Sequence, residues 1–598
     1  MCSSDLIFAS AAHVAKIETF NQRVSVVTME PRAATASYDA GSDSYTLYTG
    51  TQGVMGVKMQ TIGALQIPPP KLRVISHDVG GGFGMKASGY AEYPALLYAA
   101  RKAGKPVRWT ATRAESFVSD NQARDNLWRC ELAMDANGKF LALRVRGEAD
   151  MGAYLTGVAL YCPTVHISGC LPSVYDIPKI SVATKCYFTN KLPIGPYRGA
   201  GRPEVNHFME KLVDAAAAKT GIDPAEIRRR NLIKPSQIPY QSATGPLYDS
   251  GDFPAVFEKA LAAADYSGFP ARRAEARNRG KLRGIGVACF VEISGGVMDE
   301  SATIHFEEGD RIIATMGATP NGQGHETVFG QLVADRFGVP RSHVTLRFGD
   351  SARDVPGFGA VASRSAMLVG GAFAVSTDLV IAKGKKVAAI LLQGQEENVA
   401  YEKGMFRLKT GAGAQVSLFE AAMRSKDLAK QGVIPESLDT KGDVKTGPSF
   451  PNGCHIAEVE VDPETGVMEI VKYTSVDDCG IVLNDTIVSG QIHGGVVQGI
   501  GQAIGEHTVY DRDSGQLLSG SLMDYAMPRA GDVPRMQTLH HPVACKTNPL
   551  GVKGTGEAGT TAAPPTICNA VANAIGAKHA AKLEMPLTPQ KIWRAMHG

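Results

Sequence analysis

Short runs of apolar residues alternate with polar ones along the first hundred positions and predict strands separated by turns. Such runs cover residues 24–28, 44–48 and 72–77. Residues 90–103 instead carry apolar side chains at helical spacing, and Gly104 ends that predicted helix. Helix signals mixed with strand signals in this way predict an α+β fold.

Turn residues mark two β-hairpins, and capping residues mark two consecutive helices. Residues 135–138 (DANG) and 462–466 (DPETG) each separate two alternating runs, as a hairpin turn does. A helix is predicted from Pro203 to about Gly221, and Asp223 is predicted to cap the next one. These features predict structure and carry no function of their own.

A polar segment divides the chain into two large parts. Residues 266–283 are rich in arginine and lack an apolar period, so we interpret them as a linker with a boundary near residue 275. The predicted domains are residues 11–275 and 276–598, and the second contains an insertion at about 393–452 with a short helix at 418–428. Residues 1–10 begin MCSSDL, which resembles a translated sequencing adapter, so we interpret them as a non-native start.

Charge and composition exclude several classes of protein. The 62 Lys and Arg against 59 Asp and Glu give a net charge of +3, which creates no field for nucleic acid or an anionic membrane. No uninterrupted apolar run reaches the roughly 18 residues of a membrane helix, so we expect no membrane span. The ten cysteines are scattered without a CxxC pair. We therefore expect free thiols in a reducing compartment, with neither an iron–sulfur cluster nor a structural zinc in this chain.

The 65 glycines gather in clusters, four of which run into predicted helices. They read GGGFGMK (80–86), YRGAGRPE (197–204), NGQGHET (321–327) and GVKGTGEAGTTAAPP (551–565). A helix start offers free N–H groups and the positive end of the helix dipole, and glycine lets a phosphate or a polar ring approach the backbone. Any one cluster alone is typical of a tight turn. Four together predict a large anionic cofactor between the two halves of the chain.

Sequence context excludes three common kinds of site. Residues 554–559 match GxGxxG, but they follow NPLG instead of an apolar strand and contain Glu557, so a dinucleotide site is not predicted. The P-loop and HExxH motifs are absent from the sequence. His325, His540 and His541 are interpreted as polar residues with ordinary partners and not as metal ligands.

Eight short motifs occur in a fixed order: MEPR (29–32), TQ (51–52), GGGFGMK, YRGAGRPE, GQGHET, ASRS (362–365), VVQGIGQ (496–502) and GTGEAGTTAAPP. Through these motifs the chain resembles, from about Asn21 to its end, the molybdenum-binding large subunit of the xanthine dehydrogenase, aldehyde oxidoreductase and carbon monoxide dehydrogenase family. The resemblance implies two molybdopterin-binding α+β domains of the xanthine oxidase type. The family's hammerhead domain normally precedes MEPR and has no room here, so we expect an N-terminally truncated subunit.

The resemblance also implies a cofactor and the residues around it. The cofactor is a molybdopterin, in its cytosine dinucleotide form, that holds molybdenum through a dithiolene without a protein ligand to the metal. Gln52 would approach the metal's oxo group, and Arg198 would orient substrate. The implied cofactor-binding residues are Gly82, Phe83, Gly84, Gly199, Gly322, Gln323, Gly324, His325, Ala362, Ser363, Arg364, Gln498, Gly554 and Gly556. By residue type alone, Arg198 and Arg364 also suit pairing with a carboxylate, and Gln498 also suits a helix surface.

Glu557 is implied as the general base of an oxidative hydroxylation that takes its oxygen from water. It stands between glycines at the start of a predicted helix, where helix N–H groups lower the pKa of a carboxyl and burial raises it. The alternative is a capping carboxylate that binds those N–H groups. With Glu557, Arg198 and Gln52 complete the implied catalytic set.

Two departures from the family narrow the substrate. Carbon monoxide dehydrogenases carry a copper-binding cysteine in the loop that reads YRGAG here, and purine-hydroxylating relatives carry a glutamate where this chain has Ala87. Aldehydes and N-heteroaromatic compounds remain. The alternatives are a carbon monoxide dehydrogenase-like subunit of the YRGAGR type and a non-catalytic, pterin-binding or assembly subunit.

The chain lacks iron–sulfur cysteines and a flavin fold of its own, so electrons must pass to other subunits. The resemblance implies a small subunit with two 2Fe-2S clusters, an FAD subunit and a dimer of such heteromers, acting on a small molecule. The start carries no secretion signal, so we expect a cytoplasmic protein, with the periplasm left open because the native start is expected to be missing.

Overall fold

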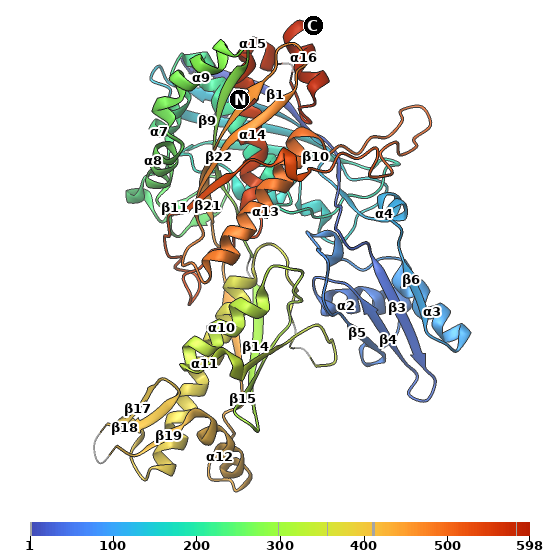
Figure 1. Cartoon of the computed structure of the whole chain (residues 1–598), viewed down its shortest axis with the longest axis vertical. Helices are drawn as coiled ribbons and strands as arrows, with labels where there is room; N and C mark the ends of the chain where they lie inside the picture. The colour runs from blue at the N-terminus through green and yellow to red at the C-terminus, as the bar shows by residue number, and fades with distance from the viewer. Residues whose placement is uncertain (1–2, 297, 354, 356, 410–412, 582) are drawn as a thin grey trace.

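The structure is a computed structural model that describes residues 3–296, 298–353, 355, 357–409, 413–581 and 583–598. Helices combine with mixed and antiparallel sheets, as the predicted α+β fold requires. Figure 1 shows an upper body that contains both ends of the chain and two parts that extend below it. One of these parts comes from the first hundred or so residues and the other from the middle of the chain.

Two four-stranded sheets form the upper body, one from each half of the chain. Their orders are β1-β8-β9-β10 and β13-β21-β22-β23. The bounds are His13–Asn21 (β1), Asn126–Met134 (β8), Phe140–Asp150 (β9), Ile180–Tyr187 (β10), Leu282–Val291 (β13), Asn452–Val461 (β21), Met468–Asp478 (β22) and Met536–His540 (β23). The predicted hairpins join β8 to β9 and β21 to β22.

Two helices join these sheets. Helix α6 (Arg202–Thr220) packs on β1, and α14 (Ala558–Ile575) packs on β13 and β21. The two helices also contact each other, so the halves of the chain share one packed layer. Gly221 ends α6 in the left-handed conformation, and Asp223 caps α7 (Pro224–Asn231), as predicted.

The first of the lower parts is a small sheet with two helices. Its order is β5-β4-β3-β6, and α2 and α3 pack against it. The bounds are Ala33–Asp39 (β3), Ser44–Thr49 (β4), Val54–Leu65 (α2), Leu72–Ile75 (β5), Glu92–Ala103 (α3) and Val107–Thr110 (β6). The strands and helix predicted here are present, with ends that differ by one or two residues, whereas the strand predicted at 24–28 is only the two-residue β2 (Val24–Ser25).

The second of the lower parts continues into a projecting lobe at the bottom of Figure 1. Its sheet has the order β16-β15-β14-β20, and a three-stranded sheet β17-β18-β19 with α12 forms the lobe. The bounds are Met298–Glu307 (β14), Arg311–Met316 (β15), His325–Phe337 (α10), Val344–Arg347 (β16), Ser365–Leu391 (α11), Val399–Glu402 (β17), Met405–Leu408 (β18), Gln415–Ser417 (β19), Leu418–Lys430 (α12) and Thr440–Thr446 (β20). Helix α12 matches the short helix predicted within the insertion.

Helix α11 is long and apolar enough to cross a membrane by length and composition, alone among helices of the described residues. Most of its apolar window, 61%, is buried inside the molecule. It packs against β14, β20 and α10. That burial is typical of a core helix.

The interpretation of residues 266–283 as an unstructured linker is wrong. This segment contains α9 (Phe269–Asn278) and the start of β13. Arg272 and Arg283 both donate to the buried Glu458 of β21 at 2.7 and 2.8 Å. The segment is held by these ion pairs, so its sequence is rich in polar residues. It therefore lacks the apolar period by which a helix can be recognised in a sequence. The N-terminal residues form α1 (Ser3–Ser10), whose Asp5 pairs with Arg144 of β9.

Candidate functional site

Three of the four glycine clusters lead directly into helices, namely α6, α10 and α14. The first cluster does not, so that prediction is wrong. It leads into a single 3-10 turn (Met85–Ala87), and α3 begins only at Glu92. Gly84 has a φ of +105°, which a right-handed helix does not contain.

The first two clusters lie against each other. The backbone N–H of Arg198 donates to the carbonyl of Phe83 at 2.9 Å. A Cβ atom on Gly84 would come within 2.4 Å of the Pro196 carbonyl oxygen, so only glycine permits this approach.

Gln52 connects the first cluster to the second half of the chain. Its Oε1 accepts from the Gly84 N–H and its Nε2 donates to the Ala360 carbonyl, both at 2.8 Å. A Cβ on Gly82 would come within 2.7 Å of the Gln52 side chain. The predicted residues Gln52, Gly82 and Gly84 therefore form one unit with the loop that precedes Ala362.

Glu557 joins three loops and does not cap its own helix. It occupies the N-cap position of α14, yet its side chain accepts no hydrogen bond from that helix. Its Oε1 accepts from the Gly199 N–H at 2.7 Å, and its Oε2 accepts from the Ser363 hydroxyl at 2.7 Å. The structure thus replaces the capping alternative with a carboxylate held by donors from both halves of the chain.

The pKa of Glu557 is set by opposing effects. Burial raises it, while the positive charge of Arg202 and the hydrogen bonds from Ser363 and Gly199 lower it, and the net result lies below the ordinary value. Glu557 is therefore ionised at neutral pH and able to accept a proton.

Arg198 lies beside Glu557 and is buried, but it forms no ion pair with any residue that the structure describes. Its Nε donates to the Gly556 carbonyl at 2.5 Å, its Nη1 to Gln498 Oε1 at 3.1 Å and its Nη2 to the Gln491 carbonyl at 3.0 Å. Burial lowers the pKa of its guanidinium. Gln498 accordingly faces the site and not the helix surface.

Arg364 pairs with a carboxylate, which is the alternative that its residue type suited. Its fully buried guanidinium pairs with Glu300 and donates to the Gly359 carbonyl at 3.1 Å. Burial raises the pKa of Glu300 to about 7, and Arg364 acts against that rise. The binding of a cofactor phosphate by Arg364 stays a prediction.

The third cluster approaches the same region through its loop. Asn321 Nδ2 donates to the Thr51 carbonyl at 3.3 Å, and its N–H donates to Gln323 Oε1. Around Gly322 an added Cβ would meet nothing within 4 Å. His325 begins α10 and is buried, and its Nδ1 has no hydrogen-bond partner among the residues described. Burial lowers the pKa of His325 to about 4, so the ring is neutral.

Backbone strain concentrates in these loops. Phe83, Ala200, Ala362 and Ser363 have φ values of +50°, +41°, +52° and +51°. Residues other than glycine adopt this left-handed region at a cost, and such outliers gather at functional sites. The fourth cluster is held equally tightly, because a Cβ on Gly554 would come within 2.0 Å of the Ser363 carbonyl oxygen.

Two buried charged residues of the site were not among the sequence-based candidates. Arg202 donates to the Ile293 carbonyl at 2.7 Å and to the Gly199 carbonyl at 3.2 Å. It lies within YRGAGRPE, so the motif itself was a signal for it. Glu292 is fully buried directly after β13 and borders Ser363. Its only sequence signal is a charged residue at the end of a buried apolar strand.

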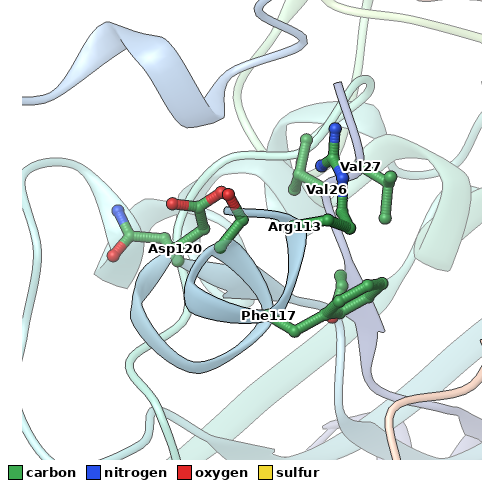
Figure 2. Close-up of a pocket in the computed structure, with 8 residues that line it drawn as sticks. Val26, Val27, Arg113, Phe117 and Asp120 are labelled. Carbon is green, nitrogen blue, oxygen red and sulfur yellow. The ribbon is translucent and has the colours of Figure 1, made fainter. Parts of the chain in front are cut away.

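A small cavity shown in Figure 2 lies elsewhere. It has a volume of about 10 Å³, enough for a single water, and is lined by Val26, Arg113, Phe117 and Asp120 together with neighbouring residues. None of the predicted site residues lines it.

The convergent loops suit a large polar anion. Three helix starts with their N–H groups meet glycine loops that are tightly packed at Gly84 and Gly554 and open at Gly322, and the neutral His325 offers a ring nitrogen without a partner among the described residues. Those features fit the pterin and phosphate groups of a molybdopterin.

Comparison with known proteins agrees with this chemistry. Two matches to the molybdopterin cofactor-binding domain cover residues 3–232 and 259–534. The chain is 33% identical to the nicotine 6-hydroxylase large subunit of Paenarthrobacter nicotinovorans and 32% identical to the carbon monoxide dehydrogenase large chain of Hydrogenophaga pseudoflava. Each alignment covers 99% of this chain, and 74% and 76% of those proteins.

Solved structures give the same result. Quinoline 2-oxidoreductase from Pseudomonas putida 86 superposes with a TM-score of 0.92 at 33% identity, over 99% of this chain and 77% of that one. The aldehyde oxidoreductase of Desulfovibrio gigas, at 21% identity and a TM-score of 0.84, shares the fold. The chain therefore belongs to the molybdenum-binding large subunits of the xanthine dehydrogenase, aldehyde oxidoreductase and carbon monoxide dehydrogenase family, which are molybdopterin-dependent oxidoreductases.

Proposed function

We propose that this chain is the catalytic subunit of a molybdenum hydroxylase that oxidises a ring carbon of an N-heteroaromatic compound, with an aldehyde as the second substrate class. A substrate C–H and one water become C–OH, and two electrons and two protons leave. When bound, the molybdenum cofactor supplies the oxygen transfer and takes up the electron pair. The protein's own part is to bind, to orient and to remove a proton.

The observation that carries this proposal is the held carboxylate of Glu557. Its Oε1 accepts from the Gly199 N–H and its Oε2 from the Ser363 hydroxyl, which leaves the carboxylate with lone-pair capacity to accept a proton. Since the pKa of Glu557 lies below its ordinary value, the base form is present at neutral pH and is lost only as the pH falls through that lowered pKa.

Other site residues position the reacting groups. Gln52 fixes the Gly82–Gly84 backbone, which would surround the metal, and Arg198 stands beside Gly556 where a substrate would be oriented. Gly322, Gly324, His325 and Gln498 would bind the pterin and its phosphates, in a cytosine dinucleotide form. Partner subunits with 2Fe-2S clusters and FAD would take the electrons.

Two considerations favour an N-heteroaromatic substrate over carbon monoxide. Two of the relatives bear the names of a nicotine hydroxylase and a quinoline oxidoreductase. The YRGAG loop has no cysteine for copper, and the thiols of Cys162 and Cys170, which feel the charge of Glu557, have pKa values raised by burial to about 12. Both remain protonated at neutral pH, unlike a metal-binding thiolate.

The test is turnover of the full chain, co-expressed with its genomic neighbours in a host that makes the cofactor. N-heteroaromatic compounds and aldehydes are screened with an artificial electron acceptor, and product made in ¹⁸O-labelled water is examined by mass spectrometry. We expect labelled product from the ring compounds. We expect Glu557→Gln to lose about 10²- to 10⁴-fold in kcat, because the general base is removed while the shape is kept.

The matched control is Glu397→Gln in the exposed lobe, which should turn over like the wild type. Molybdenum and pterin contents are measured for each variant. Full cofactor content with no turnover on any compound would refute the proposal and favour a pterin-binding or assembly subunit. Carbon monoxide oxidation with bound copper would favour the carbon monoxide dehydrogenase-like alternative.

A further inference from the structure

The packing of β13 on α14 brings a second carboxyl to Glu557. A Cβ on Gly284 would come within 2.1 Å of the Ala570 carbonyl oxygen, and one on Gly286 within 2.1 Å of the Thr566 carbonyl oxygen. Phe290 then packs on Ala558 and Ala562 at the start of the helix. Strand and helix therefore run in opposite directions at close range.

This antiparallel packing fixes where the two glutamates lie. Glu292 directly follows β13, and Glu557 directly precedes α14. Glu292 is buried and Glu557 half-buried among the same loops, and the Ser363 hydroxyl lies within hydrogen-bond distance of both carboxyl groups. Two carboxyl groups that share one hydroxyl repel each other when both are ionised, so this geometry favours a proton on one of them.

The surrounding donors decide which one carries it. Ser363 Oγ lies 2.7 Å from Glu557 Oε2 and 3.3 Å from Glu292 Oε1. Ser294 Oγ lies 3.1 Å from the Gly554 carbonyl and 3.3 Å from Glu292 Oε1. Ser363 has one proton and its much shorter contact, to Glu557, takes it, whereas Ser294 divides its proton between the Gly554 carbonyl and Glu292 Oε1.

Arg202 and Ser294 lower the pKa of Glu292, but burial and the charge of Glu557 raise it by more. No N–H or hydroxyl donates to its buried Oε2. The arginines that face the pair, Arg198 and Arg202, give their hydrogen bonds to carbonyl and amide oxygens. The remaining titratable neighbours are the buried thiols of Cys162 and Cys170 and the neutral His166, whose Nδ1 contacts the Ala200 carbonyl at 2.7 Å.

We propose that Glu292 is a positioning residue for the base: it stays protonated and donates its proton to Glu557, which keeps the Glu557 carboxylate ionised and aimed into the site. The role in turnover rests on the function proposed above, whereas the protonation of Glu292 does not. Burial and the charge of Glu557 raise the pKa of Glu292 well above its ordinary value, in agreement with this arrangement.

Infrared spectroscopy of the purified complex tests directly whether Glu292 is protonated, and it needs no turnover. A protonated carboxyl has a carbonyl band separate from carboxylate bands, and ¹³C labelling of glutamate identifies it. We expect such a band at pH 8 in the wild type and its loss in Glu292→Gln. The control Glu506→Gln removes a different buried carboxyl, whose pKa burial raises to about 7. No band at pH 8, or a band that survives Glu292→Gln, would overturn the proposal.

The positioning role is tested by the direction in which the acidic limb of the pH profile of kcat/KM shifts in Glu292 variants. Glu292→Gln keeps a neutral donor, so we expect the limb to stay within about half a pH unit of wild type. Glu292→Ala removes the donor to the charged base, so the limb should rise by about one to two pH units. If Glu292 were ionised instead, both variants would remove a negative charge and the limb would fall.

The two proposals fail separately. If no substrate is turned over, the infrared band still decides the state of Glu292, and Glu292→Gln keeps the shape of the side chain should Glu292→Ala not fold. If Glu557→Gln retains activity, the proposed base is wrong, whatever the band shows. A limb that falls in both Glu292 variants refutes the positioning role alone.

Discussion

At the residue scale, the site depends on which donors a single carboxylate receives. Glu557 accepts from a backbone N–H of the first half and from a hydroxyl of the second half. The hydroxyl belongs to Ser363, whose backbone is held in the left-handed region at φ +51°. A strained residue kept at this position indicates that its side-chain direction matters.

Ser363→Ala removes one hydrogen bond to the ionised form of Glu557. We expect the pKa of Glu557 to rise and the acidic limb of kcat/KM to move upward by about one to two pH units, with cofactor content unchanged. The control is Ser376→Ala, a buried serine of α11 that bonds the Ala302 and Ala372 carbonyls. An acidic limb at the wild-type position in Ser363→Ala would show that Ser363 does not tune the base.

The loops that carry Glu557, Gln52 and Arg198 could be recognised from sequence because their motifs are local, and the catalytic roles of the three residues stay predictions. Glu292 could not be recognised in this way, because its relation to Glu557 arises only when β13 packs on α14. The predicted role of Arg364 shows the opposite case: its motif is local, but the direction of its guanidinium depends on Glu300 in β14. Local patterns therefore identify loops better than they identify the partners of the side chains within them.

At the element scale, β13 and α14 act as a pair that positions both glutamates. Glycines at 284 and 286 let the helix backbone lie directly on the strand. Strands such as β4, β8 and β22 were predictable from alternation, but α9 was missed because its sequence is mostly polar: it buries only Phe269 and Ala276, and its Arg272 pairs with Glu458 of β21.

Gly286→Ala should push α14 away from β13, because the new Cβ would meet the backbone at Thr566 and Ala570, which cannot move aside alone. We expect a loss of about 1–3 kcal/mol in the free energy of unfolding and a lower kcat. Denaturant midpoints and turnover are compared with Gly63→Ala, an exposed glycine of α2 with open space around it. That control should gain roughly 0.5–1 kcal/mol. Equal stability and activity in Gly286→Ala would contradict the tight packing.

At the scale of the whole molecule, the lobe of β17, β18, β19 and α12 lies at the opposite end from the upper body, as Figure 1 shows. It is joined through α11, where a Cβ on Gly384 would come within 2.2 Å of the Phe406 ring. Phe406 is fully buried and is the central anchor of the lobe.

Phe406→Ala should loosen the lobe and leave the chemistry alone. We expect a cost of about 3–5 kcal/mol in local stability. Hydrogen exchange should become faster in residues 399–409 and 413–417, while kcat and KM stay at wild-type values. Exchange that stays slow would show that Phe406 does not hold the lobe, and faster exchange together with lost turnover would show that the lobe couples to the site.

The separation in sequence between Glu557 and its partner Gly199 also sets how long the ribosome takes to join them. Gly199 and Glu557 are 358 residues apart. A ribosome that adds about 5–20 residues per second needs roughly 20–70 seconds to make that stretch. During synthesis the first half therefore waits with its glycine loops uncovered, and a ribosome that stalls before residue 557 leaves a chain in which those loops never receive their cover.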